Sequence, residues 1–179
     1  MSSVDILGPI KSSLESDPYD ADVLIIKAVF SHWCDAADGR WAPAWRDIDI
    51  MTLPPPLLPY LLVADMTPDG DIVYRYWGRG HSSFHGTDYS GKLLSTMTPA
   101  WIRTFLQHQY ARVIETRSPK LFMTEYDDIA EPVYSLRLPL SDDGETVTGF
   151  LSFAERDGVS RQLRNWVRTH QGDEPQGPL

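Results

Sequence analysis

The segment that decides the fold reads Tyr60-Leu-Leu-Val-Ala-Asp-Met66, then Thr67-Pro-Asp-Gly70, then Asp71-Ile-Val-Tyr-Arg-Tyr-Trp77. A hydrophobic run and an aromatic run flank a Pro-Asp-Gly sequence, which is typical of a tight turn between antiparallel strands. The segment therefore predicts a β-hairpin with strands at about residues 60–66 and 71–77. Residues 78–91 are rich in glycine, and we expect short helical turns there rather than a long helix.

An amphipathic helix is predicted before the hairpin, over residues 20–38. Asp20 can cap this helix and Gly39 can end it. Its apolar side chains recur at spacings of three and four and form one stripe. The stripe packs either on the rest of its own domain or against a second copy of the chain. In the second case, the candidate dimer-interface residues are Ile26, Phe30 and Trp33.

A long helix and three strands are predicted after the glycine-rich stretch. Thr98-Pro99 is a strong helix start, and the helix runs to about residue 117. Strands follow at about residues 120–126, 132–140 and 146–154, and the last two form a hairpin. Period-two alternation places Leu136, Leu138 and Leu151 on one apolar face, with Arg137 on the other. We expect the long helix to pack on the apolar face. Gly149 marks either a close backbone approach or room for a ligand.

This order of elements predicts an α+β fold with a five-stranded antiparallel sheet, helices on one face and an N-terminal amphipathic helix. Residues 1–19 are predicted to be a flexible arm. Residues 20–157 form a single domain. Residues 158–179 form a tail in which a short helix at about 160–170 precedes a disordered end.

Five sequence pieces resemble a known family. They are Trp33 followed by Arg46-Asp-Ile-Asp49, Leu57-Leu-Pro-Tyr-Leu61 leading to Asp65, Tyr74-Arg-Tyr-Trp-Gly78, Gly86-Thr-Asp-Tyr-Ser-Gly91, and Leu138-Pro-Leu-Ser141 before Asp143-Gly144. In order and spacing, they resemble the small stand-alone bacterial PAS proteins of the fifth PAS subfamily, over roughly residues 25–155. The resemblance implies a PAS fold and a sensing or interaction role, with no defined ligand and no catalytic activity. The family usually has a small or aliphatic residue where this chain has Trp77 and His81, so a pocket that they face would differ in size and polarity.

Composition and charge exclude several classes of function. The formal net charge of −9 argues against nucleic-acid binding and against docking on anionic membranes. Cys34 is the only cysteine, so an intrachain disulfide is excluded. No apolar run approaches the roughly 20 residues of a membrane span, and the N-terminus does not read as a signal peptide. We therefore expect a cytoplasmic protein.

Metal, cofactor and catalytic signals are weak. His81 and His85 have a spacing used by metal sites, but they lack an obvious third ligand, so we expect no metal. His108 lies off the apolar side of its helix, and the cysteine signature of flavin photochemistry is absent, so we expect no cofactor and a colourless protein. Catalytic motifs are missing as well. We predict a non-enzyme, although an isomerase or hydratase of a related fold stays open if an isolated acid or histidine lies in a deep apolar cavity.

The most consistent reading is a sensory or adaptor protein in signal transduction, which binds a small apolar or aromatic molecule, a signalling protein, or both. The alternative is a pure interaction or dimerisation module with a filled core. A homodimer is predicted in either case. Arg75 is interpreted either as facing solvent or as pairing inward with Asp47 or Asp49. The candidate pocket residues are Trp77, His81, Phe84, Trp101, Phe105 and Leu138.

Overall fold

The predicted hairpin is present in the computed structural model, which describes residues 10–127, 129–155 and 169. Strands β2 (Leu61–Met66) and β3 (Ile72–Trp77) pair antiparallel. Between them, Gly70 has a positive φ of 84° and donates its N–H to the carbonyl oxygen of Thr67 at 2.9 Å. The Pro-Asp-Gly sequence thus folds as its turn chemistry predicts.

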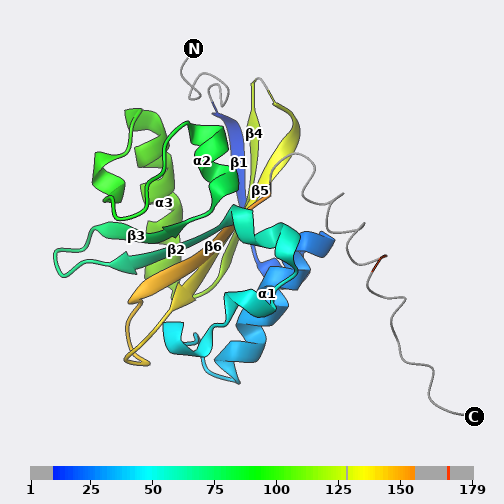
Figure 1. Ribbon diagram of the computed structural model, residues 1–179, viewed down its shortest axis with the longest axis vertical. Helices are drawn as coiled ribbons and strands as arrows, with labels where there is room; N and C mark the ends of the chain where they lie inside the picture. Colours follow the sequence, from blue (N-terminus) through cyan, green and yellow to red (C-terminus); the bar gives the residue numbers. More distant parts are fainter. Residues whose placement is uncertain (1–9, 128, 156–168, 170–179) are drawn as a thin grey trace, which may run out of the picture.

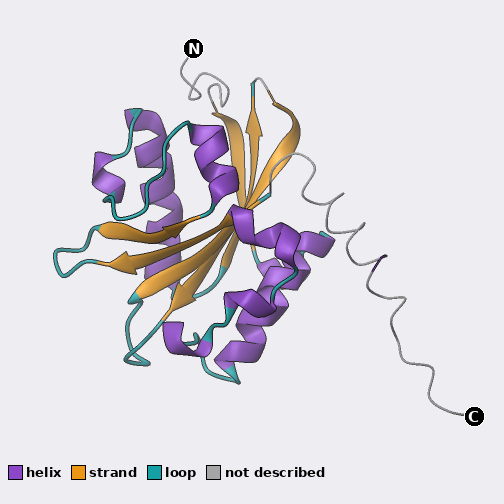
Figure 2. Cartoon of the chain, in the orientation of Figure 1, coloured by secondary structure: helices purple, strands orange, loops and turns teal. Residues whose placement is uncertain are grey.

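The described residues form a six-stranded antiparallel sheet rather than a five-stranded one (Figures 1 and 2). The strand order is β1-β4-β5-β6-β2-β3, and all adjacent pairs are antiparallel. The four other strands are β1 (Ile10–Ser16), β4 (Lys120–Tyr126), β5 (Ile129–Leu140) and β6 (Gly149–Ala154).

The additional strand, β1, corrects the prediction that residues 1–19 are a flexible arm. Its side chains are mostly exposed, so its sequence lacks the apolar alternation of a half-buried strand. It is held instead by backbone pairing with β4 and by ion pairs of Glu15 with Arg112 (Nε to Oε2, 2.8 Å) and Lys120 (Nζ to Oε1, 3.2 Å). The N-terminal residues 1–9 and the predicted tail lie outside the described residues, apart from residue 169.

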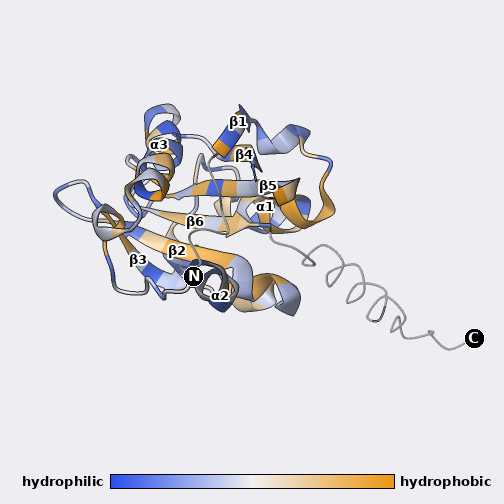
Figure 3. Cartoon of the chain, turned by 90° about the horizontal axis from the view of Figure 1, so that it is seen from above, coloured by the Kyte–Doolittle hydropathy of each residue, from blue (hydrophilic) through white to orange (hydrophobic). Residues whose placement is uncertain are grey.

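The helices cover both faces of the sheet, which corrects the prediction of helices on one face (Figure 1). Helix α1 (Leu24–Ala37) packs on one face, together with short 3₁₀ helices η2 (Pro18–Asp20), η3 (Trp45–Asp47), η4 (Ile50–Thr52) and η5 (Pro55–Tyr60). Helices α2 (Arg79–His85) and α3 (Ala100–Thr116) lie on the opposite face, with η6 (Leu94–Thr96) beside them. Figure 3 shows hydrophobic residues gathered on the strands and on α1.

Two cores result, because the central strands are buried on both sides. Every residue of β6 is buried. Leu136 and Leu138 of β5 face α1, whereas Arg137 lies between the sheet and α3, where it hydrogen-bonds to Gln109. The predicted alternation is therefore right, but the apolar face carries α1 and the long helix packs on the other face. In the hairpin of β5 and β6, Leu138 pairs with Leu151, and Gly149 pairs with Leu140.

Helix α1 begins at Leu24 rather than at Asp20, because Asp17 caps a separate 3₁₀ turn by accepting the N–H of Tyr19. Its apolar stripe is buried by the chain itself: Ile26, Phe30 and Trp33 are no more than 6% exposed. The Nε1–H of Trp33 donates to the carbonyl oxygen of Pro139 in β5 at 2.8 Å. The prediction that these three residues form a dimer contact is therefore wrong.

Candidate functional site

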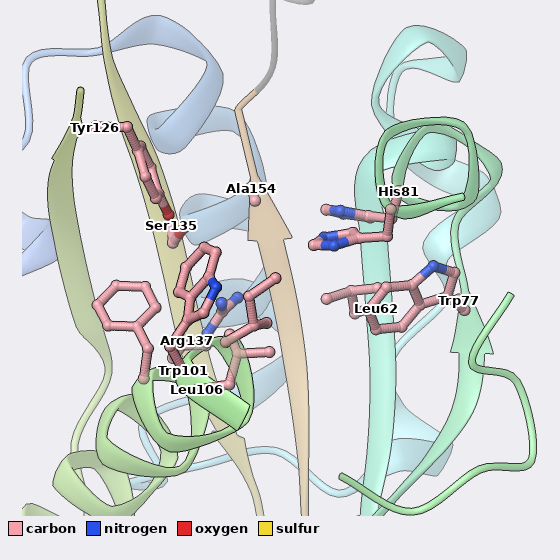
Figure 4. A pocket seen from close by; sticks show the side chains of 12 residues that line it. Leu62, Trp77, His81, Trp101, Leu106, Tyr126, Ser135, Arg137 and Ala154 are labelled. Carbon is pink, nitrogen blue, oxygen red and sulfur yellow. The ribbon is translucent and has the colours of Figure 1, made fainter. Parts of the chain in front are cut away.

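A pocket lies between the sheet and the helices α2 and α3 (Figure 4). Its volume is about 30 Å³, which is room for about two water molecules at roughly 10–15 Å³ each. Side chains from β2, β3 and α2 approach it from one side and those of α3, β4 and β5 from the other. The lining residues are Leu62, Trp77, His81, His85, Trp101, Ile102, Phe105, Leu106, Tyr126, Ser135, Arg137 and Ala154.

Two glycines bring α2 close enough to the sheet to form one side of the pocket. A Cβ on Gly78 would clash with the carbonyl oxygen of Pro59, and one on Gly80 would lie 2.5 Å from the ring of Tyr60. Only glycine permits this approach. His81 then points inward, and its Nε2–H donates to the carbonyl oxygen of Tyr60 at 2.8 Å. Because a carbonyl can only accept, this bond fixes the proton of the ring on Nε2.

Aromatic contacts hold His81 in place. Its ring centroid lies 5.6 Å from that of Trp77 and 6.4 Å from that of His85. Trp77 also contacts Tyr74 edge-on, with a centroid distance of 4.7 Å. Such offset and edge-on pairs contribute about 0.5–1.5 kcal/mol each beyond the area they bury. This side of the pocket is therefore formed by aromatic side chains that pack against one another.

The opposite side carries a buried positive charge. Arg137 is 3% exposed, and its Nε donates to Oε1 of Gln109 in α3 at 3.1 Å. Its Nη1 lies 3.5 Å from the carbonyl oxygen of Leu136, and its guanidinium lies over the ring of Tyr110 at 5.3 Å. Within the described part of the chain, Arg137 has no ion pair with a carboxylate. Arginine cannot lose its proton in a protein, so this charge is buried without a counter-charge there.

Several buried polar side chains surround Arg137. Among the described residues, Gln109 Nε2 and Ser152 Oγ are buried and make no hydrogen bond, and the buried hydroxyls of Tyr74 and Tyr110 lie beside each other. Ser152 is the residue opposite Arg137 on β6. Complete burial raises the pKa of Tyr74 well above its ordinary value, and Tyr110 acts in the same direction, while Arg137 opposes it. Tyr74 is therefore a neutral hydroxyl, which can donate or accept a hydrogen bond, whereas Gln109 Nε2 can only donate.

Four of the six predicted pocket residues line the pocket: Trp77, His81, Trp101 and Phe105. The side chain of Phe84 lies outside the described part of the structure. The prediction for Leu138 is wrong, because this residue is fully buried in the core under α1. It was assigned to the pocket on the assumption that the long helix packs on the apolar face.

Two other interpretations are resolved by the contacts. Arg75 lies on an exposed part of β3 and pairs with Asp65 (Nη2 to Oδ1, 2.6 Å), rather than with Asp47 or Asp49. Gly149 marks a close backbone approach, since a Cβ there would lie 2.7 Å from the carbonyl oxygen of Ala64.

The sequence reasoning missed Arg137 and Gln109 as site residues. A signal was present, because an arginine between two buried leucines of one strand must lie on the opposite face of the sheet. The assignment failed because nothing local indicates whether that face meets water or a helix.

A second hollow, of about 290 Å³, is more open and lies between residues 40–46 and the turn at residues 141–144. Three of the charged residues at this hollow, Arg40, Asp142 and Asp143, already have partners. Arg40 pairs with Asp47 (Nη1 to Oδ2, 2.9 Å), and Asp143 accepts hydrogen bonds from Thr146 and Glu145, which hold its pKa well below the usual range. We therefore take the pocket under α3 as the candidate site.

Comparison with family models, with curated proteins and with solved structures finds no match to this chain. Among the described residues, no three or more histidine, cysteine or acidic side chains are placed to hold a metal ion. His108 is exposed on α3. Within the same residues, the helices are too short or too polar to cross a bilayer.

Proposed function

We propose that this protein is a non-catalytic sensory or adaptor protein with a PAS fold, located in the cytoplasm. It binds a small molecule in the pocket between the sheet and α3, and it signals by changing its contacts with a protein partner. The antiparallel sheet, the hairpin at residues 61–77 and the long helix packed on it support this proposal.

One observation carries the small-molecule role: Arg137, a buried arginine without a carboxylate partner among the described residues, lines a pocket that is otherwise largely apolar and aromatic. Small-molecule sites are typically lined by apolar and aromatic side chains with a few convergent polar groups. Burying a charge costs free energy unless it is paired, and the contacts of Arg137 with Gln109 and Tyr110 do no more than about offset that cost.

Strand β5 offers a route from the pocket to the opposite surface. Arg137 of this strand lies at the pocket, while the carbonyl of the nearby Pro139 accepts the indole N–H of Trp33 in α1. A ligand that moves Arg137 would displace the backbone on which α1 rests. We therefore propose α1 and its surroundings as the output surface.

The second candidate is an adaptor with a filled core and no ligand. The small volume of the pocket favours it, since ligand sites usually measure about 300–1,000 Å³. We retain a homodimer as part of either proposal, but the stripe of α1 cannot form its interface. Light-scattering mass measures the oligomeric state.

The experiment is native mass spectrometry of the freshly purified full chain, combined with a variant that fills the pocket. Ala154→Leu places three more carbon atoms at the lining, and Ala130→Leu adds the same atoms at an exposed site on β5. A retained small-molecule mass that A154L loses and A130L keeps would support sensing. If the wild type retains no ligand and A154L is less stable than both the wild type and A130L, as overpacking of a filled core predicts, the filled-core adaptor is the better account.

A further inference from the structure

We propose that the ligand of the pocket under α3 is a small monocarboxylate with an apolar or aromatic tail, and that Arg137 binds its carboxylate. This inference rests on the proposed function, since it names the ligand class of the same site.

The charge balance of the pocket argues for an anion. Arg137 carries a permanent charge at the pocket, and the described lining residues include no aspartate or glutamate. Its Nε and Nη1 have acceptors on Gln109 and Leu136, and its Nη2 makes no hydrogen bond among the described residues. A buried arginine without a counter-charge costs free energy that an anion would recover.

The neighbouring polar atoms argue for an acceptor-only group. Gln109 lies behind Arg137 rather than in the pocket lining, and its Nε2, which can only donate, has no hydrogen-bond partner among the described residues. A carboxylate accepts several hydrogen bonds and donates none, and it matches the planar fork of a guanidinium.

The rest of the lining argues for a tail rather than for a bare inorganic ion. Leu62, Ile102 and Leu106 supply aliphatic surface, and Trp101 and Phe105 supply aromatic surface. Trp101 and Phe105 are only partly buried and sit on the first two turns of α3. Because the volume is about 30 Å³, a tail enters only when these side chains turn outward.

The test compares matched probes by NMR on the ¹⁵N-labelled full chain. Sodium acetate, butyrate and benzoate are titrated against acetamide, butyramide and benzamide, with sodium chloride at equal ionic strength. We expect the carboxylates to shift the Nε–H signal of Arg137 and the side-chain amide of Gln109, with butyrate or benzoate binding more tightly than acetate. The matched amides should bind at least about tenfold more weakly, which is the loss caused by removing one charge-assisted hydrogen bond.

Arg137→Gln is the test variant and Arg117→Gln is its control. Arg117 is exposed and stacks on Trp41 (4.4 Å from guanidinium carbon to ring centroid), and neither residue is among those that line the pocket. We expect R137Q to weaken benzoate binding at least about tenfold and R117Q to leave it unchanged. The comparison of acids with amides on the wild type stands even if R137Q fails to fold.

Each remaining outcome overturns the proposal. Equal binding of acids and amides at the pocket signals would refute the carboxylate class and leave small-molecule sensing intact. Tighter binding of chloride than of any carboxylate would identify an inorganic anion site. Binding of no probe would refute the ligand class, and the proposed function itself fails only if native mass spectrometry also shows no retained ligand.

Discussion

Replacing Arg137 and Gln109 together tests whether the buried charge opposes folding in the absence of ligand. The charged hydrogen bond to Gln109 contributes about 1.5–3 kcal/mol, and the buried contact with the Tyr110 ring contributes about 2 kcal/mol. Dehydrating the guanidinium costs several kcal/mol. These terms nearly cancel, so the charge itself adds little to stability.

The single variants should therefore be worse than the double variant. Arg137→Met leaves the amide oxygen of Gln109 without its donor, at a cost of about 1–3 kcal/mol. Gln109→Leu leaves the charge less paired, at a cost of about 3 kcal/mol. The double variant R137M/Q109L removes both groups. Its free energy of unfolding should lie within about 1 kcal/mol of the wild-type value or exceed that value.

Urea unfolding of dialysed protein, followed by tryptophan fluorescence, measures these differences, provided that the m-value stays constant. Arg75→Met is the matched control, because its pair with Asp65 is partly exposed and should contribute no more than about 1 kcal/mol. If the double variant loses as much as the two single variants combined, the buried charge is not a liability and the argument for an anionic ligand fails.

Three further predictions concern other parts of the fold. Trp33→Phe leaves the carbonyl of Pro139 without its donor and should cost about 1–3 kcal/mol in urea unfolding, so a wild-type midpoint would contradict the packing of α1 on β5. Gly149→Ala places a Cβ 2.7 Å from a carbonyl oxygen of β2 and should cost about 1–3 kcal/mol, which an unchanged melting temperature would disprove. The pKa of Glu15 is lowered, chiefly by the hydrogen bond from its arginine partner on α3, so its stabilising effect is present above the unfolded value of about 4.3 and is lost as pH falls through the lower folded value. Glu15→Gln should thus lower the free energy of unfolding by about 0.5 kcal/mol at pH 7 and by less at pH 3. The control is Glu131→Gln, at an exposed position of β5, whose effect on the free energy of unfolding should be the same at both pH values. If the two variants behave alike in urea unfolding, the ion pairs of Glu15 do not hold β1 on the sheet.

The sequence predicts the local elements well because their signals are local. The turn at Gly70 and the helix that follows Pro99 depend on backbone preferences of a few neighbouring residues. Both are present within one or two residues of their predicted positions.

The sheet edge and the assignment of faces depend on distant contacts. Strand β1 is mostly exposed, so its sequence resembles a loop and only its pairing with β4 makes it a strand. The stripe of α1 has the same periodicity whether it packs on a sheet or on a second chain. The surroundings of Arg137 are set by Gln109, which lies 28 residues away, and no pattern in β5 reveals them.

The position of β1 has a practical consequence for expression of shortened versions. The boundary that the sequence suggests, near residue 20, would remove a strand that pairs with β4 from Ile10 to Ser16. Strand β4 would then become the edge strand of the sheet, with a row of unpaired backbone N–H and C=O groups. An exposed edge strand is a template for intermolecular strand pairing. A chain that lacks residues 1–19 should therefore aggregate at concentrations at which the full chain does not.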